Sequence, residues 1–164
     1  MKGFEKIIKL SKKKKLRVKA PSYKVPDWFS KIKPSTAHGS TPSQKKAWRV
    51  VSEYVRQRDW KKGCVSCRKP FERWEDAQAG HYIPWSTCHG IFKYDLRNLA
   101  AQCGHDNAWG GGKAGYDFAN ELVRRRGADI INQLEYENEL FRGKKIEEWE
   151  LVEMVAKLAP HLVV

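Results

Sequence analysis

Hydrophobic residues recur at helical spacing in several parts of the chain. The first such stripe occupies positions i, i+3, i+4, i+7 and i+8 from Ala47 to Val55, which places these side chains on one face of a helix. Thr41 and Pro42 precede the stripe as an N-cap and a first-turn residue, so this helix is expected to begin there and to end near residues 59–60. Later stripes predict helices over residues 107–127, 130–140 and 146–158.

The segment between the first and second helical stripes, residues 63–100, lacks helical periodicity. Two short apolar runs, Gly80–Pro84 and Ile91–Tyr94, are expected to form strands around a loop. At the N-terminal end of the chain, a lysine run and scattered Pro, Ser and Gly predict a basic, poorly ordered tail. The predicted organisation is a tail at 1–40, a core of helix and strands at 41–128, and C-terminal helices at 129–164 that pack on the core or form a dimer surface.

The net charge of +13 is spread unevenly along the chain. Residues 1–34 contribute +10 and residues 35–128 contribute +7, whereas residues 129–164 contribute −4. A polyanion such as DNA would therefore meet the tail and the middle of the chain rather than the C-terminal helices. No apolar run is long enough to span a bilayer, and the first residues do not resemble a secretory signal, so the sequence predicts a cytoplasmic protein without a membrane partner.

The four cysteines suit metal binding better than disulfide bonding in that compartment. Two of them form a Cys-x-x-Cys pair at 64–67, which is the spacing of a zinc knuckle. A second turn at 103–106 repeats this spacing, with a carboxylate in the last position. The residue directly before that carboxylate carries an imidazole. Zinc accepts either the carboxylate or the imidazole as a ligand. Cys88 has no evident partner. The predicted zinc ligands are Cys64, Cys67, Cys103 and either Asp106 or His105.

Three polar residues lie between or beside the two cysteine-bearing turns. His81 follows a glycine, Asn98 precedes an apolar run, and Asn107 begins a predicted helix. A neutral imidazole can take a proton from water, and phosphodiester hydrolysis needs such a base together with a cation on the phosphate. The alternative is structural: a packed histidine, a turn asparagine and a helix cap. Taken singly, the two asparagines do not distinguish these interpretations.

Basic and aromatic residues around this region are candidates for nucleic-acid binding. Basic side chains would contact phosphates, and an indole could stack on a base. For the two tryptophans in the set, burial in the core is the alternative. The candidates are Trp85, Lys93, Arg97, Trp109, Lys113, Arg124, Arg125 and Arg126.

Five segments together carry a resemblance to a known family. They are Arg56–Asp59, Cys64–Cys67, Ala79–Tyr82, Arg97–Asn98 and Gln102–Asn107. Their order resembles that of HNH (ββα-metal) nucleases and, more narrowly, the phage NinG/Rap recombination endonucleases, over roughly residues 44–140. The resemblance implies an α+β fold, with a zinc-stapled ββα-metal core and flanking α-helices. It also implies a metal-dependent DNA endonuclease acting on branched recombination intermediates such as Holliday junctions, in the host cytoplasm if the chain is phage-encoded.

The resemblance also implies a role for each polar residue. His81 would be the general base, Asn98 would orient the His81 loop, and Asn107 would bind a catalytic Mg²⁺ or Mn²⁺ while the Zn²⁺ stays structural. Two departures stand out. Asp106 occupies the position of the family's last zinc cysteine, and Gln78 occupies that of an acidic residue before the histidine, with Glu75 and Asp76 as nearby substitutes.

Further expectations concern assembly and the competing functions. An enzyme that cuts a junction symmetrically is expected to be a homodimer. A non-catalytic, zinc-bearing nucleic-acid-binding module would also explain the charge, the aromatics and the cysteines. An RNA-directed nuclease or RNA-binding protein is a third alternative, and nothing in the sequence indicates recognition of a 2′-hydroxyl.

Overall fold

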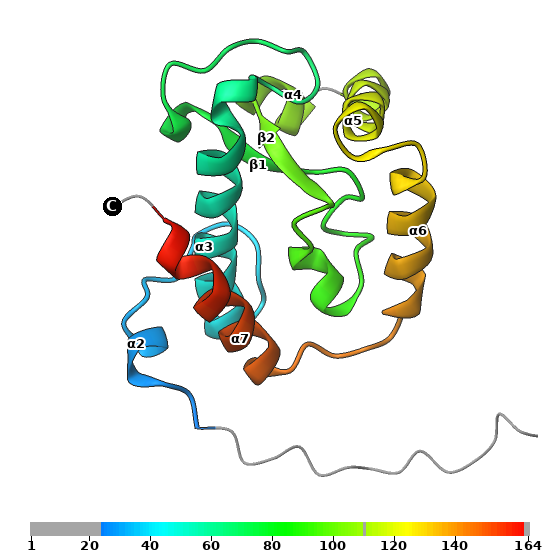
Figure 1. Ribbon diagram of the computed structural model, residues 1–164. Coiled ribbons are helices and arrows are strands. Elements are labelled where there is room, and N and C mark those ends of the chain that lie inside the picture. The colour runs from blue at the N-terminus through cyan, green and yellow to red at the C-terminus, as the bar shows by residue number, and fades with distance from the viewer. Residues whose placement is uncertain (1–23, 110, 163–164) are drawn as a thin grey trace, which may run out of the picture.

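The computed structural model describes residues 24–109 and 111–162, and it confirms a mixed α+β architecture (Figure 1). Two antiparallel strands lie between α3 on one side and α5 and α6 on the other. The strands are β1 (Gln78–His81) and β2 (Leu99–Gln102), and the α-helices are α2 (Asp27–Ser30), α3 (Pro42–Asp59), α4 (Gly104–Trp109), α5 (Gly111–Arg126), α6 (Ile130–Leu140) and α7 (Glu148–Leu158). The 3₁₀ helices are η1 (Trp60–Lys62), η2 (Trp74–Asp76), η3 (Gly90–Tyr94) and η4 (Ala159–His161).

The register of the two strands decides which side of the sheet each residue faces. His81 pairs with Leu99, and Ala79 pairs with Ala101. Because alternate residues of a strand point to opposite faces, His81 shares a face with Ala79. Ala79 and Leu99 pack in the core formed with α3 and α7, whereas Ala100 packs in a second core formed with α5 and α6. The sheet therefore turns His81 toward α3.

The helix α3 forms as its sequence pattern predicts. The Thr41 hydroxyl accepts a hydrogen bond from the Gln44 amide at 3.2 Å, and Pro42 occupies the first turn. The helix ends at Asp59, and Gly63 follows η1 with a φ of +74°, where a residue without a side chain is favoured. Its buried face is wider than the predicted stripe because it includes Trp48.

The predicted strand at Ile91–Tyr94 is wrong, since these residues lie in the 3₁₀ helix η3. Alternate burial of Phe92 and Tyr94 imitates the two-residue period of a strand. However, the Phe92 amide donates to the His89 carbonyl at 3.1 Å, and the Asp95 amide donates to the Phe92 carbonyl at 3.0 Å, so the backbone closes into tight turns. The partner of β1 is instead β2, and β1 begins two residues before the predicted Gly80–Pro84.

The segment 24–40 belongs to the folded domain rather than to the predicted tail. Within α2, Phe29 is 1% exposed and packs in the core beside α3. Lys46 of α3 donates to the carbonyls of Phe29 and Ser30, at 3.3 and 2.7 Å. Burial of one aromatic ring, together with these bonds, holds the segment on α3. The rest of the predicted tail, residues 1–23, lies outside the described residues.

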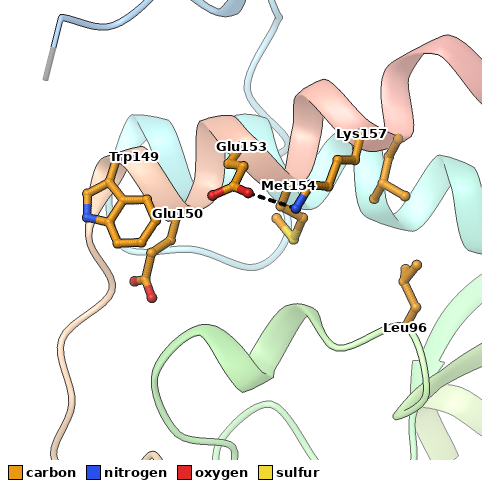
Figure 2. A pocket seen from close by; sticks show the side chains of 7 residues that line it. Leu96, Trp149, Glu150, Glu153, Met154 and Lys157 are labelled. Carbon is orange, nitrogen blue, oxygen red and sulfur yellow. Dashed lines mark hydrogen bonds and ion pairs between the residues drawn. The ribbon is translucent and has the colours of Figure 1, made fainter.

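The C-terminal helices α6 and α7 pack on the two cores described above. In α7, Leu151, Val152 and Val155 are buried in the core that includes α3, and α6 buries Leu134 beside α5. The outer side of α7 and Leu96 line a hollow of about 400 Å³, shown in Figure 2, and a dimer contact here stays a prediction. Among the described helices, none combines the length and apolar character needed to cross a membrane.

Candidate functional site

The two cysteine-bearing turns meet and form a cluster of four metal-ligating side chains. The ligand atoms of Cys64, Cys67, Cys103 and Asp106 all lie within 4.8 Å of one another. The Cys64 Sγ is 3.3 Å from Asp106 Oδ2, and the Cys67 and Cys103 sulfurs are 3.8 Å apart. Three thiolates and one carboxylate are ligands that tetrahedral zinc accepts. The cluster could therefore bind a metal such as zinc.

Backbone hydrogen bonds shape both turns around the sulfurs. In the first turn, the Cys64 amide donates to the Lys69 carbonyl at 2.8 Å, and Arg68 adopts a φ of +61°. In the second, the Cys103 amide donates to the Cys64 sulfur at 3.3 Å, and the Asp106 amide donates to the Cys103 sulfur at 3.5 Å. Amide donors directed at sulfur favour the thiolate form, which is the form that binds metal.

The structure places Asp106, and not His105, in the cluster. The His105 side chain is 80% exposed, and its Nδ1 lies 3.2 Å from the other carboxylate oxygen of Asp106. Hydrogen bonding from the Cys67 thiol holds the pKa of Asp106 well below its ordinary value. Burial, together with Asp106, raises the pKa of Cys67 to about 12. Ionising all four side chains together would therefore need a nearby cation to balance their charge.

His81 ends β1 with its imidazole held on two sides. Its Nε2 lies 3.0 Å from the Lys93 carbonyl oxygen, which can only accept, so Nε2 carries the hydrogen and Nδ1 keeps a free lone pair. The Trp48 indole stacks on the ring. The pKa of His81 is lowered to about 4, chiefly by burial and also by the nearby His38 and Lys93, while the hydrogen bond to the Lys93 carbonyl acts in the opposite direction. The imidazole is therefore neutral at pH 7.

Asn98 is fully buried behind the loop that follows His81. Its Oδ1 accepts from the Ile83 amide at 2.8 Å, and its Nδ2 donates to the Ile83 carbonyl at 3.1 Å. The same Nδ2 lies 3.3 Å from the Cys88 sulfur, and that thiol donates to the Ile83 carbonyl at 3.1 Å. Asn98 and Cys88 thus fix the loop after His81 from within the core.

Asn107 is joined to the first residue of β1. Its Nδ2 donates to Gln78 Oε1 at 2.8 Å. The side-chain oxygen of Asn107 takes no part in this bond. Asp76, a predicted substitute for the missing acidic residue, accepts instead from the Arg73 backbone amide at 3.1 Å. The neutral Gln78 is thus the side chain that meets Asn107, and it contributes no negative charge.

His81 and Asn107 line one cleft, which has a volume of about 360 Å³. Gly111 and Gly115 of α5 form part of its wall, and a Cβ added at either position would have nothing within 4 Å. Asp106 lines both this cleft and the hollow beside the cysteines, so the two sites are neighbours. The structure thus brings His81 and Asn107 to a shared cleft and places Asn98 behind the His81 loop.

Trp109, at the end of α4, is an exposed aromatic residue that directly follows Ala108 of this cleft. It is 82% exposed, which excludes the core alternative for this residue. Trp85 is half-buried: its ring packs against the main core, with Lys93 above it at 4.7 Å from the centroid. Of the two tryptophans, only Trp109 presents its ring freely to a ligand.

Several of the predicted phosphate-binding cations are engaged within the protein. Arg97 pairs with Asp95 and Glu137, and Arg124 and Arg125 both bond Glu121. The Arg125 side chain is only 11% exposed. The remaining candidates are also occupied: Lys93 donates to the Trp85 carbonyl, Lys113 pairs with Asp117, and Arg126 donates to the Leu96 carbonyl.

Sequence reasoning missed two aromatic residues of the site, His38 and Trp48. The His38 ring stacks on Trp85, with centroids 4.5 Å apart, and lies edge-on to His81 at 5.6 Å. A lone histidine in a segment rich in Pro and Ser carries no periodic signal. Trp48 did carry one, because it precedes Val51 and Val55 by three and seven positions and so shares their helical face.

Comparison with protein-family models gave a match over nearly the whole chain. Residues 4–159 match the family described as Bacteriophage Lambda NinG protein, which confirms the resemblance seen in the sequence. No curated protein and no solved structure matches the chain. The matched range includes the cysteine cluster, the cleft and the segment that carries His38.

Proposed function

We propose that this chain, which belongs to the bacteriophage lambda NinG family, is a metal-dependent DNA endonuclease. One observation carries the proposal: the neutral imidazole of His81, with a free Nδ1, lines the same cleft as Asn107. A base that is neutral at pH 7 and a carboxamide oxygen able to bind a cation are the two functions that phosphodiester hydrolysis needs.

In the proposed reaction, His81 activates a water molecule in the cleft. Its Nδ1 takes a proton as the water oxygen forms a bond to phosphorus, and the bond from phosphorus to the 3′ oxygen breaks. The hydrogen bond from Nε2 to the Lys93 carbonyl keeps the lone pair on Nδ1 and supports the imidazolium that results. The leaving 3′ oxygen takes a proton from solvent.

The proposed cation ligand is the Asn107 side-chain oxygen, because its amide nitrogen is bonded to Gln78. A bound Mg²⁺ or Mn²⁺ would supply charge stabilisation to the phosphate and the leaving oxygen. Such ions keep several waters and bind few protein ligands when substrate phosphate is present, so a neutral pair of amides suits a site that the substrate completes. Such a site is expected to bind the cation only weakly in the absence of DNA.

The cysteine cluster has a structural role in this proposal. Cys64, Cys67, Cys103 and Asp106 would hold Zn²⁺ and join the first turn to the start of α4. Asn107 directly follows Asp106, so the zinc would fix the position of Asn107 against β1. The strands β1 and β2 with α4 then form the proposed ββα-metal core.

Branched DNA, such as a Holliday junction, is proposed as the substrate on the basis of the resemblance alone. The charge of +7 over residues 35–128 and the exposed Trp109 support DNA as the partner. A symmetric cut across a junction would require two copies of the chain, so a homodimer belongs to the same proposal.

The direct test is cleavage of a labelled four-way junction by the purified, zinc-loaded chain with Mg²⁺ or Mn²⁺. His81→Ala should lower the rate about 10²- to 10⁴-fold, which is the usual contribution of a general base. His161→Ala is the matched control, since this histidine of η4 contacts Tyr54 of α3 and does not line the cleft. Undiminished cleavage by His81→Ala would refute the assigned base. Cleavage assays run in parallel on duplex DNA and on structured RNA distinguish the DNA endonuclease from the RNA-directed alternative.

The second candidate function is a non-catalytic, zinc-bearing nucleic-acid-binding module. Gln78 favours it, because an amide stands where the family has an acidic cation ligand. Calorimetric titration of the zinc-loaded protein with Mn²⁺, with and without DNA, distinguishes the two. A second, labile binding event supports the nuclease, whereas zinc binding alone supports the module.

A further inference from the structure

A second imidazole reaches the cleft from the N-terminal segment. His38 stacks on Trp85 with ring planes 12° apart, and it lies edge-on to Trp48 at 4.9 Å and to His81 at 5.6 Å. Three aromatic neighbours thus hold a half-buried ring beside the proposed base. Neither the sequence pattern nor the resemblance assigns this residue a role.

The position of His38 relative to Asn107 is the first argument. The cleft that contains His81 and a neighbouring hollow of about 300 Å³ are both lined by His38 and by Asn107. Gln78 lines the second hollow. His38 therefore borders both spaces that Asn107 borders, and its ring lies beside the proposed base. A phosphate bound in the cleft would have His38, His81 and Asn107 among the residues around it.

The hydrogen bonding of the two histidines differs, which is the second argument. The His81 Nε2 is occupied by the Lys93 carbonyl. For His38, no hydrogen-bond partner is found among residues 24–109 and 111–162, and its contacts are through the ring faces and edges. Burial and the nearby Lys93 lower the pKa of His38, so its ring is neutral at pH 7 and offers one N–H donor.

The backbone beside His38 is held on α3, so the ring does not depend on packing alone. The Ser35 amide donates to the Lys45 carbonyl at 3.1 Å, and the Ser40 amide donates to the Gln44 side chain at 2.8 Å. Gly39 has a φ of +115°, and a Cβ added there would come within 2.8 Å of the Lys45 nitrogen. The segment can therefore approach the helix this closely only with glycine at that position.

We propose that His38 is a further catalytic residue, whose imidazole N–H donates a hydrogen bond to a non-bridging oxygen of the scissile phosphate. This inference rests on the proposed nuclease function. His81 takes the proton of the attacking water, and His38 stabilises the charge that builds on the phosphate oxygens as the new bond forms. The segment before α3, which the sequence assigns to a tail, then completes the active site.

Two substitutions separate this chemistry from simple packing. His38→Phe keeps an aromatic ring against Trp85 but removes the donor, and His38→Gln keeps an N–H donor but removes the ring. If His38 bonds the phosphate, His38→Phe should lower kcat about 10- to 100-fold with a smaller change in KM, and His38→Gln should retain more activity. A packing role predicts the reverse order, which would overturn the proposal. His161→Phe, at a histidine that contacts Tyr54 and does not line the cleft, should match the wild-type chain.

A second measurement tests the contact without relying on cleavage. The imidazole ¹⁵N resonances of the zinc-loaded wild-type chain are recorded while junction DNA is added without Mg²⁺ or Mn²⁺, and His38 is assigned from the resonance lost in His38→Phe. We expect the His38 resonance to shift and that of His161 to stay. DNA binding detected by fluorescence anisotropy without a His38 shift overturns the contact, as does absence of DNA binding. A His38 shift in a chain that cleaves nothing would uphold the contact and reject the nuclease.

Discussion

The indole of Trp48 lies parallel to the imidazole of His81, with ring centroids 5.0 Å apart and planes 16° apart. Trp48 is 4% exposed and belongs to the core between α3 and α7. One face of His81 is therefore covered by the hydrophobic core, while its Nε2 is tied to the Lys93 carbonyl. The stacking of Trp48 on His81 helps to set both the orientation and the low pKa of His81, because the indole excludes water from the imidazole ring.

The first prediction concerns pH and stability. His81 protonates near pH 6.5 in the unfolded chain but only near pH 4 in the folded chain, so the unfolded chain binds more protons between these values. The contribution of His81 to the free energy of unfolding should therefore be fully present above pH 6.5. It should fall by roughly 3 kcal/mol as pH decreases to 4. Urea unfolding at each pH measures it. His81→Phe should flatten this dependence, and an unchanged slope in that variant would contradict the prediction.

Much of the cysteine cluster and of α3 could be predicted, because their signals are local. The spacing of Cys64 and Cys67 fixes a turn, and the period of the apolar residues fixes the face of α3. The choice between His105 and Asp106 was not local. Neighbouring residues of a helix point about 100° apart, so the docking of α4 on β1 decides which of the two meets the sulfurs.

The failures of sequence reasoning came from interactions with distant segments. Alternating burial at Phe92 and Tyr94 fits a strand, but a strand also needs a partner, and β1 pairs with residues 99–102 instead. His38 lies in a segment whose composition resembles a linker, and only its contacts with Trp85 and Trp48 place it in the cleft. Composition cannot report such contacts.

The second prediction concerns the buried amide of Asn98. Asn98→Ala leaves both the amide and the carbonyl of Ile83 with fewer partners, so we expect a loss of about 2–4 kcal/mol in the free energy of unfolding. Asn98→Asp should not restore it, because a carboxylate oxygen would face the Ile83 carbonyl. Denaturant unfolding provides the measurement. The exposed Asn120→Ala is the control, with an expected change within about 0.5 kcal/mol.

The third prediction concerns zinc and the two adjacent polar residues of α4. Asp106→Ala removes a ligand and should lower both zinc content and Tm, whereas Asp106→Cys should retain one zinc per chain. His105→Ala removes only a neighbour of the carboxylate, so zinc should remain bound with an affinity at most about 10- to 100-fold weaker. Metal analysis and thermal unfolding with a chelator check these results. Greater zinc loss in His105→Ala than in Asp106→Ala would reverse the assignment.

The fourth prediction compares an available aromatic residue with an engaged cation. Trp109 is 82% exposed next to the cleft, so Trp109→Ala should weaken DNA binding by about 1–3 kcal/mol without changing stability. Tyr136→Ala is the matched control, since Tyr136 is also exposed but lies on α6 in the acidic C-terminal part of the chain. Fluorescence anisotropy at several salt concentrations measures both. Equal losses in the two variants would show that aromatic exposure alone, rather than position beside the cleft, determines binding.

Arg97 provides the contrasting case in the same titrations. Its guanidinium is bonded to Asp95 and Glu137, and these bonds raise its pKa further above the ordinary value. A cation that is already neutralised by two carboxylates releases few counterions from DNA, so Arg97→Ala should leave the salt dependence of binding nearly unchanged. The same variant should lower the free energy of unfolding, because Glu137 on α6 loses its partner on the loop before β2. A shallower salt dependence in Arg97→Ala would show that Arg97 leaves its carboxylates to bind phosphate.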